Sequence, residues 1–269
     1  MLSRHNGRRW RAVIRLIQNE LYKTFRLKKL YIFMAVLAVH AWLTVHFYNE
    51  GGEWKSVILM PNGQSLPLTL LNSMAQFMTV FIPVYVADLI TDEVKTGTLK
   101  MSLLRPVRRI EWLNAKIVSL FVFITFLLVF SIAAEYAIGT LAFGWGGQTL
   151  YAGSLYTPTE GVWLTLRLTF SMLLPYMACG MIVILIAVLA ANISTTIGLS
   201  IGMLTAAQYL KAFEHLEPYS IVHQMYFFHE YVHPISGEAA SQIIAVIAGY
   251  IVVFYLVTAI IVKRKDFIL

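Results

Sequence analysis

The chain has 269 residues, of which 58% are hydrophobic and only 13% are charged. A soluble domain carries charge on about a quarter of its residues, so this composition excludes a soluble globular protein. Repeated apolar runs of about 20 residues, the length that crosses a bilayer core, predict an all-α, polytopic membrane protein. The net charge of +7 lies beside these runs, so nucleic acid is not an expected partner. The sequence contains no GxxxxGK[ST] phosphate loop, so we do not expect the chain to bind ATP by that route.

Residues 1–29 predict an amphipathic helix on the cytoplasmic side. Apolar residues recur at steps of three and four, while the only acid is Glu20. The apolar positions are Trp10, Ile14, Ile17, Leu21 and Phe25, and the cations are Arg4, Arg8, Arg9, Arg11, Arg15, Lys23, Arg26, Lys28 and Lys29. A basic helix of this kind suits a membrane surface, although it could instead pack against another protein. A cleaved signal peptide is not expected, because the first apolar run starts only after this long charged segment.

Six membrane spans are predicted within residues 30–262. Their approximate ranges are 30–48, 68–90, 117–143, 162–191, 195–210 and 240–262. Pro83 and Pro175 fall inside the second and fourth spans and should kink them. A polar segment with four histidines, residues 211–239, joins the last two spans and is expected to be external.

The distribution of lysine and arginine predicts the orientation of these spans. Nine of the 21 cations precede the first span, six lie in residues 88–116 and three follow the last span. Cytoplasmic loops carry the excess of lysine and arginine, so both termini and residues 88–116 should be cytoplasmic.

Residues 88–116 form a charged interruption between the second and third spans. Thr91, Asp92 and Glu93 can cap a helix and place acids at its positive end. Pro106 would end that helix, because a proline disfavours helical geometry at the residue before it. A simpler alternative is that the basic residues only fix the topology; these are Arg105, Arg108 and Arg109.

The same segment carries a spaced pattern that reads E-x3-G-T-L, then P-V-x-R, then a lysine in the next helix. Its residues are Glu93, Gly97, Thr98, Leu99, Leu103, Pro106, Val107, Arg109 and Lys116. The pattern resembles that of the membrane (permease) subunits of type 2 ATP-binding-cassette transporters, which are mostly exporters. The six-span layout and the amphipathic N-terminal helix also fit this family.

The resemblance implies a function that residue spacing alone does not. Such a subunit pairs with a second permease subunit, as a homodimer or a heterodimer, in the bacterial plasma membrane. It has no catalytic site or cofactor of its own, and a separate cytoplasmic ATPase binds ATP and Mg²⁺. Residues 91–104 would be the coupling helix that docks on this ATPase, beside residues 1–29 at the membrane surface. The coupling residues would be Asp92, Glu93, Gly97, Thr98, Leu99, Arg105, Pro106 and Arg109.

Two features inside the spans are further candidate sites. Glu135 and Arg167 are costly at membrane depth, so we expect them to form an ion pair or else to line a polar path. Small residues recur every four positions in the fifth span and allow close helix packing, within the subunit or along a homodimer seam. These residues are Ser194, Gly198, Gly202 and Ala206.

Residues 229–233 read HEYVH and offer a competing enzyme interpretation. In zinc metalloproteases an HExxH helix places two histidines on one face as metal ligands, with the glutamate as base. Here these would be His229, His233 and Glu230. Pro234 disfavours helical geometry at His233, so we expect no metal there. A non-transporting scaffold or sensor subunit is the third alternative, and it would have no ATPase partner.

Overall fold

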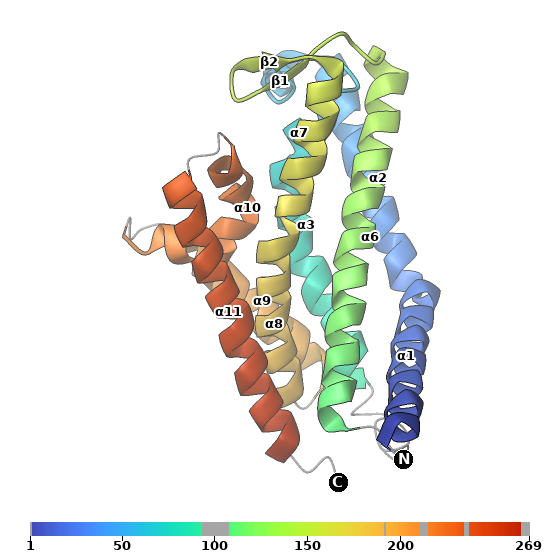
Figure 1. Ribbon diagram of the computed structural model, residues 1–269. Coiled ribbons are helices and arrows are strands. Elements are labelled where there is room, and N and C mark those ends of the chain that lie inside the picture. The colour runs from blue at the N-terminus through green and yellow to red at the C-terminus, as the bar shows by residue number, and fades with distance from the viewer. Residues whose placement is uncertain (1, 93–107, 191, 210–214, 234–236, 265–269) are drawn as a thin grey trace.

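A computed structural model describes residues 2–92, 108–190, 192–209, 215–233 and 237–264 (Figure 1). These residues are mostly helical, as the composition predicts. The long elements are α1 (Leu2–Arg26), α2 (Lys28–Glu50), α3 (Leu66–Val86), α6 (Arg109–Phe143), α7 (Pro158–Ser171), α8 (Leu173–Leu189), α9 (Ile193–Ala207), α10 (Ile221–Val232) and α11 (Gly237–Arg264). The short elements are the helical turns η1 (Gly52–Ser56), η2 (Ala87–Asp92) and η4 (Glu217–Tyr219) and the strands β1 (Thr149–Tyr151) and β2 (Ser154–Tyr156).

Among the described residues, five helical segments are long and apolar enough to cross a membrane. They are Lys28–Glu50, Leu66–Thr91, Arg109–Phe143, Pro158–Leu189 and Ala240–Arg264. The predicted fifth span corresponds to α9, which has 15 residues. At 1.5 Å per residue such a helix is about 22 Å long, shorter than a hydrocarbon core of about 30 Å. Five of the six predicted spans are therefore long enough to cross a membrane, and the remaining one, at α9, stays a prediction.

The start of α1 and the end of α11 lie at the same end of the bundle, and the β1–β2 hairpin lies at the opposite end (Figure 1). The start of α6 also lies at the end where α1 starts and α11 finishes. We call this the terminal end. The segment 93–107, which falls outside the described residues, therefore connects two elements there.

Two prolines explain where the long helices change geometry. Pro175 has no N–H, so it cannot bond to the carbonyl four residues earlier, and the fourth span divides at Met172 into α7 and α8. Pro83 lies near the end of α3, which continues as the π-helical turn η2. A π-turn widens the helix and often marks a functional position. Both interruptions occur in the spans for which the sequence predicted kinks.

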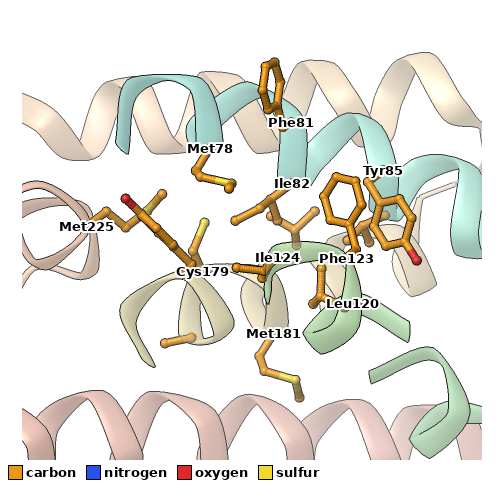
Figure 2. Close-up of a cluster of buried hydrophobic side chains, with 14 of the residues drawn as sticks. Met78, Phe81, Ile82, Tyr85, Leu120, Phe123, Ile124, Cys179, Met181 and Met225 are labelled. Carbon is orange, nitrogen blue, oxygen red and sulfur yellow. The ribbon is translucent and has the colours of Figure 1, made fainter. Parts of the chain in front are cut away.

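The core is built from facing apolar side chains of α3, α6, α8 and α10 (Figure 2). The rings of Tyr85 and Phe123 stack with their centroids 3.9 Å apart. Cys179 is buried in this cluster, as expected for a small core residue. Gly180 permits α8 to approach α6 closely, because a Cβ atom there would overlap the side chain of Leu120.

Two of the connections between predicted spans contain regular structure. The Gly-rich connection after α6 contains the β1–β2 hairpin, whose turn residues Ala152 and Gly153 have φ of 49° and 77°. Positive φ at both central residues is typical of a type I′ turn, which matches the twist of the two strands. The histidine-rich segment contains α10, which packs against α3, α7, α8 and α11. The segment that was expected to be external therefore contributes one face of α10 to the core.

The N-terminal helix α1 packs along α6 through polar residues and through Phe25 of its apolar stripe, whose ring meets that of Phe126 edge to face with centroids 5.2 Å apart. Glu20 and Thr24 are buried, whereas Ile14 and Phe25 are 51% and 39% exposed. The two interpretations of this helix are therefore compatible: Glu20, Thr24 and Phe25 contact the bundle, while Ile14 remains exposed.

Candidate functional site

A buried ion pair joins α1 to α6 at the terminal end. Lys116 Nζ lies 2.5 Å from Glu20 Oε2, and both residues are buried. Lys23 lies 3.2 Å from the other carboxylate oxygen, at the more exposed side. A buried charge is tolerated only when it is paired and hydrogen-bonded, so this pair fixes α1 against α6 in one register.

Three hydroxyl groups continue this contact into α3. Thr24 Oγ1 lies 2.8 Å from Tyr85 Oη and 2.9 Å from Ser119 Oγ, and the last two oxygens are 2.8 Å apart. Thr24 also donates to the carbonyl of Glu20. Because these hydroxyls satisfy one another away from water, they link α1, α3 and α6 with little freedom.

The residues before segment 93–107 are bonded to three other helices. Asp88 in η2 forms an ion pair with Lys29 of α2 at 2.7 Å. Thr91 Oγ1 lies 2.9 Å from Thr196 Oγ1 of α9 and 3.5 Å from the carbonyl of Ala187 in α8. The π-turn therefore has contacts with α2, α8 and α9.

The residues after segment 93–107 are bonded to α11. Arg109 Nη1 donates to the carbonyl of Lys263 at 3.0 Å, in the last turn of α11. Such a contact satisfies a carbonyl that has no partner within the helix, and it places positive charge at the negative end of the dipole. The N–H of Arg108 bonds to Glu111 Oε2 at 3.0 Å and so caps the start of α6.

The contacts just described, from Glu20 to Lys263, form what we call the anchoring network. Of the predicted coupling residues, the structure describes the backbone of Asp92, at the end of η2, and all of Arg109. The others lie outside the described residues: Glu93, Gly97, Thr98, Leu99, Arg105 and Pro106. Sequence reasoning missed the pairing of Glu20 with Lys116. The signal was present, since Glu20 is the lone acid in a basic helix and Lys116 begins an apolar run.

The structure does not bring Glu135 and Arg167 into the predicted ion pair. Glu135 Oε1 accepts a hydrogen bond from Ser131, one turn earlier on α6, at 2.6 Å. Arg167 Nη2 lies 3.2 Å from His233 Nδ1. Each polar side chain thus has a closer partner than the other, which removes the reason to expect the pair.

The HEYVH residues do not share a helical face. His229 is buried in α10, whereas His233 follows the last residue of that helix in extended geometry. His233 Nε2 lies 2.8 Å from Tyr156 Oη, and its Nδ1 faces Arg167, so both ring nitrogens have partners. Among the described residues no group of three His, Cys, Asp or Glu side chains is placed to hold a metal ion. The residues present do not fit a zinc site.

The small residues of α9 face away from the rest of the subunit. Added Cβ atoms at Gly198 and Gly202 would meet nothing within 4 Å. Thr196, Ser200 and Leu204 form the buried face instead. The predicted small-residue stripe is exposed, so it does not pack within the subunit; its residues are Ser194, Gly198, Gly202 and Ala206.

Comparison with known proteins places the chain in one family. Residues 56–268 match the family model described as "Protein of unknown function (DUF2705)". No curated protein matches the chain. The matched region runs from η1 to beyond the end of α11 and so includes the π-turn, segment 93–107 and Arg109. The chain belongs to the DUF2705 family.

Proposed function

We propose that this chain is the membrane subunit of an ATP-binding-cassette exporter and that residues 91–104 dock on its ATPase. The observation that supports this proposal best is the anchoring network. The described residues on both sides of segment 93–107 are bonded to helices that are distant in the sequence. A loop that merely connected two spans would not need these contacts.

A movement of this segment could be transmitted through these contacts to several helices of the bundle. A push on η2 would be passed to α2 through Asp88 and to α9 through Thr91. A push on the start of α6 would be passed to α11 through Arg109 and to α1 through Lys116. Packed helices respond to such a push by changing between discrete arrangements, because cores are close-packed. ATP-driven closure of a partner could thereby alternate the access of the spans.

The proposal includes two protein partners and an orientation. The ATPase would hold ATP and Mg²⁺ on the cytoplasmic side of the bacterial plasma membrane, next to both termini. A second permease subunit would pack on the outward stripe of α9, where small residues permit close approach of two backbones. This chain would then contribute transport but no catalytic group.

Purification of the tagged chain from its native membrane tests the docking. We expect an ATP-binding-cassette ATPase to copurify with the wild-type chain, and Gly97→Pro or Glu93→Ala to reduce its recovery without loss of the membrane subunit. Lys55→Ala is the matched control, since Lys55 is exposed in η1 at the end of the bundle opposite the termini. Recovery of the intact chain without any ATPase would refute the proposal and favour a scaffold or sensor subunit.

A further inference from the structure

Two adjoining hollows lie beside α7: one is lined mainly by α7, with Tyr156 of β2 and His233, and the other by side chains of α6, α7, α8, α10 and α11. Figure 1 shows how these helices are arranged. The hollow nearer the hairpin has a volume of about 750 Å³, and the one next to it about 540 Å³. Phe170 lines both, so they meet at its side chain. We call the pair the side groove. Each hollow is within the size range of ligand pockets, about 300–1,000 Å³.

The two halves of the side groove differ sharply in polarity. The half nearer the hairpin contains Arg167, His233, Tyr156 and Glu160. The other half is lined almost entirely by apolar side chains, among them Phe121, Leu174, Met177, Phe228 and Ile251. The groove is therefore amphipathic along its length.

The charge at the polar half is not balanced by a nearby acid. Arg167 donates to His233 Nδ1, which requires an unprotonated nitrogen there, so His233 is neutral and its Nε2–H can donate to Tyr156. Glu160 caps the start of α7 through two hydrogen bonds from Thr157. Among the described residues no carboxylate lies within 4 Å of the Arg167 guanidinium. Most of its five N–H donors are thus available to a ligand.

We propose that the side groove binds an anionic phospholipid, with the head group at Arg167 and an acyl chain along Phe170 into the apolar half. An arginine on the flank of a membrane helix is costly without an anion, and a phosphate can accept two of its N–H groups. The apolar half has no polar group that would recognise a water-soluble ligand: Ser171, its one hydroxyl, donates to the carbonyl of Leu168. The site is independent of the proposed transport function.

Photolabelling of the full chain in lipid nanodiscs tests this site. The probes are phosphatidylglycerol and phosphatidylcholine that carry the same diazirine acyl chain. We expect phosphatidylglycerol to label peptides that contain Phe170–Met177 and Ile244–Ile251 more strongly than phosphatidylcholine does. Arg167→Gln should reduce that preference by about tenfold, because it removes a charge-assisted contact. Lys55→Gln, which removes an exposed cation elsewhere, should leave the preference unchanged.

A second variant keeps the test decisive if Arg167→Gln fails to fold. Ser171→Phe places a ring in the apolar half and leaves Arg167 intact, so it should suppress labelling of the groove by both probes. Equal labelling by the two lipids in the wild-type chain would overturn the proposal. So would labelling of the groove in Ser171→Phe at the wild-type level, since the acyl chain would then lie elsewhere.

Discussion

The pairing of Glu20 with Lys116 determines how the N-terminal helix can sit on the bundle. Both side chains are buried, so neither charge can return to water unless α1 separates from α6. Buried pairs add little net stability compared with apolar residues, but removal of one partner is costly. The pair therefore mainly fixes the position of α1 along α6. It lies close to the segment that we propose to dock on the ATPase.

Lys116→Met should strongly destabilise the purified protein, by about 3–5 kcal/mol, because Glu20 would keep a buried charge without its closest partner. Thermal unfolding in detergent, followed by intrinsic fluorescence, measures the effect as a lower midpoint. The double variant Glu20→Leu/Lys116→Met should recover part of the loss. Lys23→Met is the control and should cost less than about 1 kcal/mol, because that cation is more exposed. Equal midpoints for Lys116→Met and Lys23→Met would contradict this account.

The contact between His233 and Arg167 predicts a dependence of stability on pH. Burial and the neighbouring guanidinium lower the pKa of His233 below its ordinary value of 6.5. The unfolded chain then binds a proton more readily than the folded one, so the contribution is complete above about pH 6.5 and is lost as the pH falls. The unfolding midpoint of the wild-type chain should drop more steeply between pH 7.5 and pH 5 than that of His233→Gln, within roughly this window. Parallel pH profiles would show that His233 does not titrate as described.

At the scale of elements, glycine has opposite roles in α8 and α9. Gly180 is buried where α8 approaches α6, whereas Gly198 faces open space. Substitution by alanine at each position therefore distinguishes the effect of close packing from the effect of helix propensity.

Gly180→Ala should lower the free energy of unfolding by about 1–3 kcal/mol, because the added methyl group overpacks the contact with Leu120. Gly198→Ala is its matched control and should be neutral or stabilising by up to about 1 kcal/mol, since alanine favours the helix. Chemical denaturation in mild detergent distinguishes the two. The account would fail if Gly198→Ala were the more damaging change.

Bulkier residues on α9 test the proposed subunit contact. Gly198→Leu combined with Gly202→Leu should prevent close backbone approach and convert a dimer to a monomer, with little change in the unfolding midpoint of the monomer. Size-exclusion chromatography with light scattering measures the mass. Ser200 lies on the buried face, so Ser200→Leu should impair folding instead. An unchanged dimer in the double variant would exclude α9 as the seam.

The sequence predicted the long helices well because their apolar runs are long and end at charged or turn residues. It also located the interruptions at Pro83 and Pro175, where the covalent structure of proline decides the outcome. It did not reveal α10, because that helix is short and carries histidines that resemble a polar loop. The hairpin depends on a two-residue turn with positive φ, and its Ala152 gives no sign of that geometry.

The candidate site was only partly predictable for a different reason. The spacing of acids, glycine and proline indicated a functional segment near residue 97, but contacts between distant parts of the chain decide how its flanks are held. The hydroxyls of Thr24, Tyr85 and Ser119 are unremarkable in the sequence, and only the fold brings them together. The same holds for His233, whose partners Arg167 and Tyr156 come from separate elements.

At the scale of the whole molecule, the bundle has two ends of different character. The hairpin end is closed by hydrogen bonds between loops, such as Asn62 to Gln148 at 2.7 Å and Gln64 to Gly146 at 2.6 Å. The terminal end is instead joined by ion pairs and hydroxyls between helices. A force on the terminal end would therefore act on helices, while the opposite end would hold its shape. This asymmetry is what the proposed coupling needs.

Accessibility of residue 98 tests the docking most directly. Cys179 is buried, so Thr98→Cys in a Cys179→Ser chain provides one reactive thiol for a membrane-impermeant maleimide. We predict no labelling in intact cells, weak labelling in inverted native vesicles, and several-fold stronger labelling after urea removes peripheral proteins. The control, Lys55→Cys in the same background, should be labelled in intact cells and be insensitive to urea. Labelling of Thr98→Cys in intact cells, or equal labelling before and after urea, would contradict a cytoplasmic segment covered by an ATPase.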